Sequence, residues 1–322
     1  MSVETRFILT IALIVASTAA GYLARRFGLL RESLARPIMT GMMVVVTPVV
    51  GLLAVWEVHL SVSDIWLPTL GFVHATFLVI LSLWIARALF RDRQDQGLFG
   101  LSCAAGNHGI AMAGFVIFLL SGEQGLGYST VHNLYCSFAL VFLCYPIAKY
   151  YSPNTKTRSL GRLLVSGLAD VRSIALPACA VGILLNISGL PRPRVFSNYK
   201  IVDILVYLVI VMAYVSIGLR LHVGRVWKIK GMILGMLGVR HLIGPALGVG
   251  LLSLTLLTPW PLSGLRKEVF LIQSSVPMAV MGVAAANIFH LKPHEASAMF
   301  VVSSLVYLAL GLPIIVWLFG GN

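Results

Sequence analysis

The feature that most constrains the fold of this chain is a series of long apolar runs. A helix rises about 1.5 Å per residue, so about 20 apolar residues cross the hydrocarbon core of a bilayer. Ten such runs can be marked, at 6–24, 34–56, 65–89, 98–120, 127–149, 168–188, 201–221, 231–256, 268–289 and 295–319. The pattern predicts an all-α integral membrane protein with ten transmembrane helices.

Composition excludes a soluble protein. Hydrophobic residues make up 58% of the 322 residues and charged residues 11%, whereas soluble domains carry about a quarter charged residues. The net charge of +13 would suggest nucleic acid in a soluble protein. Here the basic residues lie in short gaps between the runs, so we expect contact with membrane lipids and no nucleic acid.

The two halves of the chain resemble each other. Gly21-Tyr22-Leu23 in the first run matches Gly182-Ile183-Leu184 in the sixth, and Val50-Gly51-Leu52 in the second matches Ile217-Gly218-Leu219 in the seventh. Five spans per half force the second half to enter the membrane upside down. The matches therefore predict the inverted repeat of many transporters.

The boundaries of these halves follow from the central polar gap. We expect a first five-helix repeat at 1–150, a cytoplasmic linker at 151–167, and a second, inverted repeat at 168–322. If the N-terminus lies outside, the cytoplasmic gaps hold 17 Lys and Arg residues and the outer segments hold 6, with Arg240 left out. This bias predicts that both termini lie on the extracytoplasmic side of the cell (inner) membrane.

No carboxylate lies at mid-membrane. All 11 acidic residues fall in gaps or at the ends of runs. Many ion-coupled carriers keep an intramembrane carboxylate to bind the driving ion, so its absence argues against a carboxylate relay. Sodium held by backbone carbonyls and hydroxyls, or proton coupling through another residue, stays compatible with the sequence.

The fourth and ninth runs are interrupted near their middles. In the fourth run, Gly106 and Gly109 flank Asn107 and His108. Glycine weakens a helix, and Asn and His are costly in lipid. We favour an unwound helix whose polar groups face a cavity, and the alternative is a tight helix crossing with Asn107 bonded to a neighbouring backbone.

The ninth run supplies a second interruption at Ser274, Ser275 and Pro277. Proline removes a backbone donor and frees a carbonyl group, although proline kinks in membrane helices are often purely structural. Two breaks at equivalent places in inverted halves favour a substrate site. The N-termini of half-helices there would suit an anion.

Three polar residues inside the apolar runs are further candidates for a functional role. His108 could contact an anionic substrate, couple transport to protons, or be a neutral hydrogen-bonding residue. Asn133, near the start of the fifth run, is expected to line the cavity, whereas His74 and His132 receive no role. Arg240 lies inside the eighth run, and we favour snorkelling to the surface or a structural role over a functional buried charge.

No enzyme pattern is found. The chain has no HExxH, no phosphate-binding Gly-rich loop with Lys, and no embedded pair of Asp residues. We therefore expect neither an enzyme nor a cofactor or metal site.

Several motifs together resemble the auxin efflux carrier family, in its bacterial form. They are Gly21-Tyr22-Leu23-Ala24-Arg25-Arg26-Phe27-Gly28-Leu29-Leu30, Thr47-Pro48-Val49-Val50, Asn107-His108-Gly109, Ser216-Ile217-Gly218-Leu219 and Val276-Pro277-Met278-Ala279-Val280-Met281. Each is short, but their order extends over nearly the whole chain. The short central gap resembles that of bacterial members.

This resemblance carries specific expectations. The family includes plant auxin carriers and bacterial proteins linked to malonate or malate transport, and it shares a fold class with the bile acid sodium symporters. It implies that the fourth and ninth helices cross at the substrate site, that Asn107 and Pro277 lie there, and that two domains move in an elevator-like motion. The chain departs from the family at Ala113 and Gly114, where members often have proline.

The sequence thus predicts a secondary transporter of a small organic anion, a carboxylate. The predicted substrate-binding residues are Asn107, His108, Gly109, Asn133, Ser274, Ser275 and Pro277. A sodium-coupled symporter of a bile-acid-like amphipathic anion is the second interpretation, and a channel or membrane sensor the third. Glycines on membrane faces permit a homodimer.

Overall fold

The computed structural model describes residues 3–153, 174–220 and 223–320, so most of the predicted linker 151–167 lies outside the described residues. In these ranges no β-strand is present. The helices are α1 (Val3–Arg26), α2 (Ala35–Gly41), α3 (Thr47–Glu57), α4 (Trp66–Leu89), α5 (Arg93–Ala104), α6 (Phe115–His132), α7 (Leu134–Ala139), α8 (Tyr145–Tyr151), α10 (Ala175–Ile187), α11 (Arg194–Asn198), α12 (Ile201–Arg220), α13 (Lys230–Gly238), α14 (Gly244–Thr255), α15 (Gly264–Ser274), α16 (Val280–Ile288), α17 (Pro293–Val306) and α18 (Leu312–Phe319).

Seven of the described segments are long and apolar enough to cross a membrane, which confirms the predicted class of all-α membrane protein. They are Ile8–Arg26, Glu32–Glu57, Val62–Leu89, Ile110–Tyr151, Ile201–Arg220, Val226–Thr255 and Pro293–Phe319. The 42-residue segment bends sharply at Gly122, whose φ of 63° and ψ of −153° favour glycine. Two helices therefore meet at that bend.

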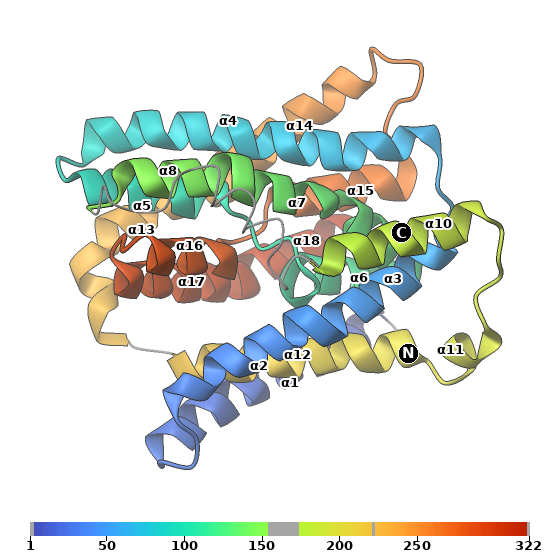
Figure 1. The fold of residues 1–322 in the computed structure, drawn as a ribbon, viewed down its shortest axis with the longest axis horizontal. Coiled ribbons are helices and arrows are strands. Elements are labelled where there is room, and N and C mark those ends of the chain that lie inside the picture. Colours follow the sequence, from blue (N-terminus) through green and yellow to red (C-terminus); the bar gives the residue numbers. More distant parts are fainter. Residues whose placement is uncertain (1–2, 154–173, 221–222, 321–322) are drawn as a thin grey trace.

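Four helices, α1, α3, α10 and α12, form one layer, which extends from the lower side of Figure 1 to its right side. In this layer α1 packs along α12, and α3 packs along α10. Glycine makes both contacts close: a Cβ atom at Gly218 would overlap the carbonyl oxygen of Thr18, and one at Gly182 would lie 2.8 Å from that of Leu52. Such close approach through small residues is how membrane helices commonly associate.

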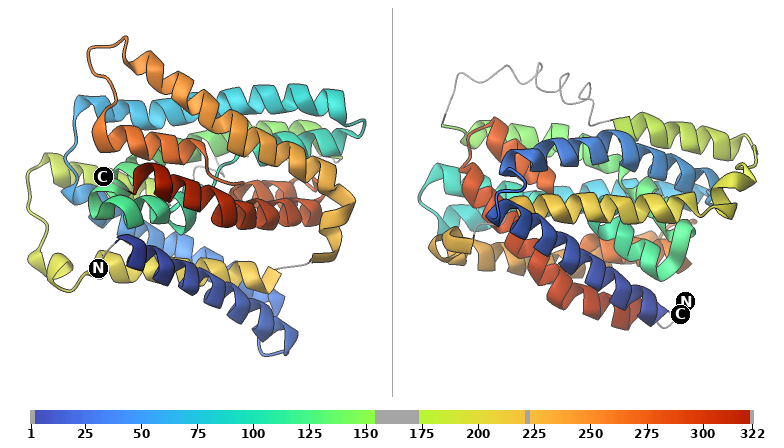
Figure 2. Two further views of the ribbon diagram at one scale, coloured as in Figure 1. Left: turned by 180° about the vertical axis from the view of Figure 1, so that it is seen from behind. Right: turned by 90° about the horizontal axis from the view of Figure 1, so that it is seen from below.

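Apart from α2 and α11, which contact α12, the remaining helices form a second group. α4 contacts α5, α14 and α15, α5 packs against α8, and α16 packs against α17. Figure 2 shows α14 running obliquely across α4 on the side of the molecule hidden in Figure 1. This group contains both interrupted helices, so its packing decides where the breaks meet.

Prolines inside the long helices are accommodated by π turns. Pro48, Pro146, Pro245 and Pro313 each stand second in a helix that follows a five-residue π segment. Proline lacks the N–H and its ring clashes with the carbonyl four residues earlier. The wider π turn absorbs this clash, so the helices continue through these prolines.

Ion pairs join the helix ends at one end of the bundle. Arg192 pairs with Glu57 and lies 2.7 Å from the Glu123 carboxylate, while Arg266 lies 2.5 Å from Asp64. Glu57 ends α3 and Asp64 precedes α4, so one connection receives both arginines. The pairs hold the loops of both halves together at this end.

A second ion cluster lies just beyond the C-terminal ends of α4 and α16. Lys292 Nζ is 2.5 Å from carboxylate oxygens of both Asp92 and Asp95. The hydrogen bond from Lys292 lowers the pKa of Asp92 below its usual value. Burial alone would lower the pKa of Lys292, but its bonds to the two carboxylates outweigh this effect and raise it. The pair of Lys292 with Asp92 therefore stays ionised at neutral pH, and its contribution to stability is lost as the pH falls through the lowered pKa of Asp92.

Candidate functional site

Two helices are interrupted at the centre of the fold. α5 ends at Ala104 and helical structure resumes at Ile110, while α15 ends at Ser274 and α16 begins at Val280. Both interruptions are present where the sequence predicted them.

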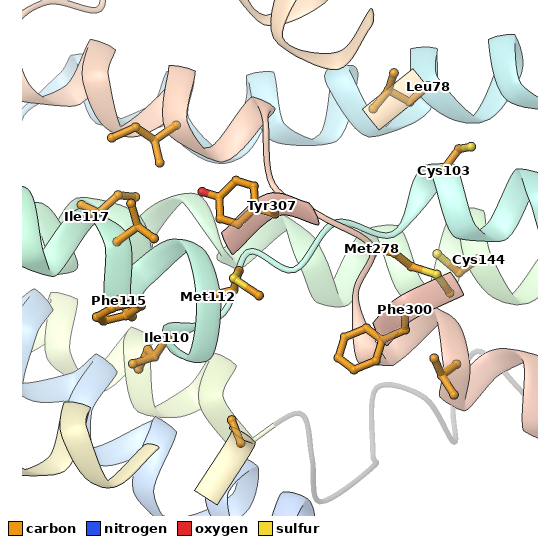
Figure 3. Packing of buried hydrophobic residues seen from close by; sticks show 14 of the residues in the cluster. Leu78, Cys103, Ile110, Met112, Phe115, Ile117, Cys144, Met278, Phe300 and Tyr307 are labelled. Atoms are coloured by element: carbon orange, nitrogen blue, oxygen red, sulfur yellow. The ribbon is translucent and has the colours of Figure 1, made fainter. Parts of the chain in front are cut away.

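The two non-helical segments cross as an isolated antiparallel bridge. The Asn107 N–H donates to the Pro277 carbonyl at 2.8 Å, and the Ala279 N–H donates to the Ala105 carbonyl at 2.7 Å. Figure 3 shows Met278 beside the extended course of the first segment. Each segment thus satisfies backbone groups that the other helix break has freed.

A cavity of about 1170 Å³ lies against this crossing. Four predicted site residues line it: Asn107, His108, Gly109 and Asn133. The Asn107 side chain is partly exposed, and no hydrogen-bond partner is found for its carboxamide among the described residues. This group is therefore free to bind a polar molecule in the cavity.

The predicted residues of the ninth run are placed differently. Ser274, Ser275 and Pro277 are not among the residues that line the cavity. The two serine hydroxyls donate to carbonyl groups three residues earlier in their own helix, at 2.7 and 2.8 Å. Pro277 takes part through its carbonyl group, which accepts the bond that positions the first segment.

His108 is buried in a hydrogen-bond network. Its Nδ1 lies 2.8 Å from Gln273 Oε1, and its Nε2 lies 2.7 Å from the Tyr135 hydroxyl. Gln273 Nε2 donates to Ser129 Oγ at 2.8 Å, which leaves Oε1 to accept from the His108 Nδ1–H. Asn133 Nδ2 donates to the His108 carbonyl at 2.7 Å. All these bonds are satisfied when the imidazole is neutral.

Two histidines without a predicted role pack near this network. The His132 ring centre lies 5.3 Å from that of His108 and 5.1 Å from that of Tyr135. His74 Nε2 lies 2.9 Å from the Gly244 carbonyl oxygen. These contacts fix the rings around the crossing.

Both breaks present a helix N-terminus to the cavity. Helical structure starts after Gly109 in one and after Ala279 in the other, and neither start has a side-chain cap. Residues 109–112 and 279–281 line the cavity. The first N–H groups of a helix lack intrahelical partners and carry its positive dipole end, so this arrangement favours an anion.

Arg240 is buried at the crossing, with 1% of its surface exposed. Its Nε and Nη2 donate to the Val276 carbonyl at 2.9 and 2.5 Å, and Nη1 donates to the Cys103 carbonyl at 3.0 Å. The snorkelling interpretation is therefore wrong, because the side chain points into the bundle and binds both interrupted helices.

Sequence reasoning missed three members of the network, Ser129, Tyr135 and Gln273. None of the three was among the predicted site residues. Asn133 and Tyr135 are polar groups two residues apart in an apolar run, which was the available signal. Gln273 lies 165 residues from His108, and no local pattern connects them.

The chain matches no protein-family model and no curated protein. The interpretation of the crossing therefore depends on its geometry and chemistry.

Proposed function

We propose that this protein is a secondary transporter that carries a small organic anion, a carboxylate such as malonate, malate or an auxin-like acid, across the cell membrane. The observation that carries the proposal is the crossing. Two interrupted helices direct uncapped N-termini into one cavity of about 1170 Å³, and transporters commonly bind anionic substrates at such half-helix ends.

The proposal includes ten transmembrane helices in two inverted halves, 1–150 and 168–322. Reciprocal packing supports it: α1 of the first half lies on α12 of the second, and α10 of the second lies on α3 of the first. A two-fold relation between the halves would produce such exchanged contacts. The interrupted segments would then be the fourth and ninth helices.

The resemblance to the auxin efflux carrier family supports an elevator-type alternating access. In this mechanism the layer of α1, α3, α10 and α12 would serve as the scaffold. The crossing would move against it together with the second group of helices. The substrate would thus change sides without leaving the crossing.

Individual residues have different roles in this proposal. Asn107 donates to the substrate carboxylate, and Pro277 positions Asn107 through the backbone bond of 2.8 Å. His108 and Asn133 shape the adjacent wall. A substrate contact by Ser274 or Ser275 would need a conformation in which their hydroxyls leave the carbonyls of their own helix.

The cavity supports an inward-facing state. Its lining extends from the crossing to Arg36, Trp227 and His294, beside helix ends that the charge bias assigns to the cytoplasm. Ion pairs of Arg192 and Arg266 join the loops at the opposite end. Both termini would then lie on the extracytoplasmic side.

Cysteine labelling tests this orientation. Cys136 is partly exposed and lines the cavity, so a membrane-impermeant thiol reagent should label it from the cytoplasmic side alone. Substrate should slow the labelling. Cys136→Ser is the control for labelling at other thiols, and equal labelling in right-side-out and inside-out vesicles would contradict the inward-facing state.

The cavity volume also favours a second candidate. Pockets for drug-sized ligands measure about 300–1,000 Å³, and the volume of about 1170 Å³ exceeds the needs of a dicarboxylate. A symporter of a bile-acid-like amphipathic anion, coupled to sodium, would use such space.

Transport by the purified protein in liposomes separates these candidates. We expect saturable uptake of a mono- or dicarboxylate from a panel that also contains indole acetate and bile acids. Uptake of bile acids alone, with strict dependence on sodium, would favour the second candidate. Absence of uptake in both direct and counterflow formats, across the panel, would contradict both.

A further inference from the structure

Interrupted membrane helices leave carbonyl groups without partners in their own helix. In sodium-coupled carriers, such unwound carbonyls and half-helix C-terminal ends coordinate the ion. Here the carbonyl groups in question are those of Cys103, in the last turn of α5, and Val276, just after α15. Both are bound by the same side chain.

The Arg240 guanidinium lies where these two carbonyls converge. It spans them with three donor bonds of 2.5 to 3.0 Å. Gly106 leaves room for it, because a Cβ atom there would overlap Arg240 Nη2. Substitution of this glycine would displace the guanidinium, so the break and the arginine fit each other.

The charge of Arg240 is not balanced by a carboxylate. No ion pair of Arg240 is found in the described part of the chain, where the paired carboxylates lie at helix ends. The guanidinium instead faces the negative ends of two half-helices, which stabilise a cation. A metal cation bound at this position would be held in the same way, by carbonyl dipoles alone.

We propose that Arg240 is a built-in cation that takes the place of a coupling sodium ion at the crossing. The inference rests on the proposed transport function and specifies its coupling: the protein binds its anion without sodium at this position. The guanidinium cannot lose its proton in a protein, so this charge is present throughout the transport cycle. The inference also separates the two candidate functions, because the second needs sodium.

The melting temperature of the purified wild-type protein tests the inference without any substrate. At equal ionic strength, replacement of N-methylglucamine chloride by sodium chloride is expected to leave Tm unchanged. A saturable rise of Tm with sodium would overturn the inference. Since no transport is measured, this result is independent of whether the substrate panel succeeds.

Two substitutions at the same position sharpen the test. Arg240→Lys keeps a charge and should stay insensitive to sodium. Arg240→Ala empties the position, so its Tm should fall and then rise saturably with sodium. Arg91→Ala, which removes an exposed arginine, is the control and should respond to neither salt. An Arg240→Ala protein whose Tm does not change with sodium would overturn the inference. If this variant fails to fold, the wild-type measurement still tests the inference.

Discussion

Replacing Asn107 by alanine is expected to weaken the apparent affinity for the carried anion by about 10- to 100-fold, since a hydrogen bond to a charged group contributes about 1.5–3 kcal/mol. The carboxamide lines the cavity and has no partner among the described residues. Its loss should therefore leave Tm close to that of the wild type. Uptake as a function of substrate concentration, in liposomes, measures the effect.

The matched control for this prediction is Asn287→Ala. Asn287 lines the same cavity, but its Nδ2 donates to the Val283 carbonyl of its own helix at 2.8 Å. Its removal should change affinity little. Equal losses of affinity in Asn107→Ala and Asn287→Ala would mean that the cavity binds substrate without a specific contact at the crossing. An unchanged affinity in Asn107→Ala would show that Asn107 does not bind the substrate.

The second large effect is expected from Gly218→Val. A Cβ atom at this position would overlap the carbonyl oxygen of Thr18 and would lie 2.8 Å from the backbone nitrogen of Tyr22. These are backbone atoms, so no rotamer change can relieve the clash, and α1 must separate from α12. Overpacking of this kind costs about 1–3 kcal/mol or more. We expect a large fall in Tm and in the yield of monodisperse protein.

Gly250→Val is the control for the intrinsic cost of valine in a helix. Gly250 lies in α14, and a Cβ atom there would meet nothing within 4 Å. This variant should keep a Tm near that of the wild type. If Gly218→Val were equally stable, the close contact of α1 with α12 would be wrong, and the reciprocal packing that supports the inverted repeat would lose its basis.

The helix breaks illustrate how far local sequence information extends. Gly106, Gly109 and Pro277 act on the backbone at their own positions, and the interruptions occur there. The polar groups between the glycines line a cavity, as predicted for Asn107 and His108. For Ser274 and Ser275 the same reasoning identified the break but not the direction of the hydroxyls, because that direction depends on which carbonyl lies nearest.

The burial of the Arg240 side chain could not be predicted from the local sequence. From the sequence, a charge about nine residues into an apolar run could reach the surface or enter the bundle. Only the crossing of α5 and α15 brings together two carbonyl groups that lack a partner in their own helix. They belong to Cys103, 137 positions before Arg240, and to Val276, 36 positions after it. Without them, burial of the guanidinium would be too costly.

What the sequence by itself determined is the membrane class, the helical content and the places where helices break. These follow from the free energy of placing each residue in lipid and from local backbone preferences. Only the tertiary structure decided the bridge between Asn107 and Pro277, the network of His108 with Gln273 and Tyr135, and the burial of Arg240. The physical reason is that partners for polar groups in a membrane come from distant segments, and packing alone determines which segments meet.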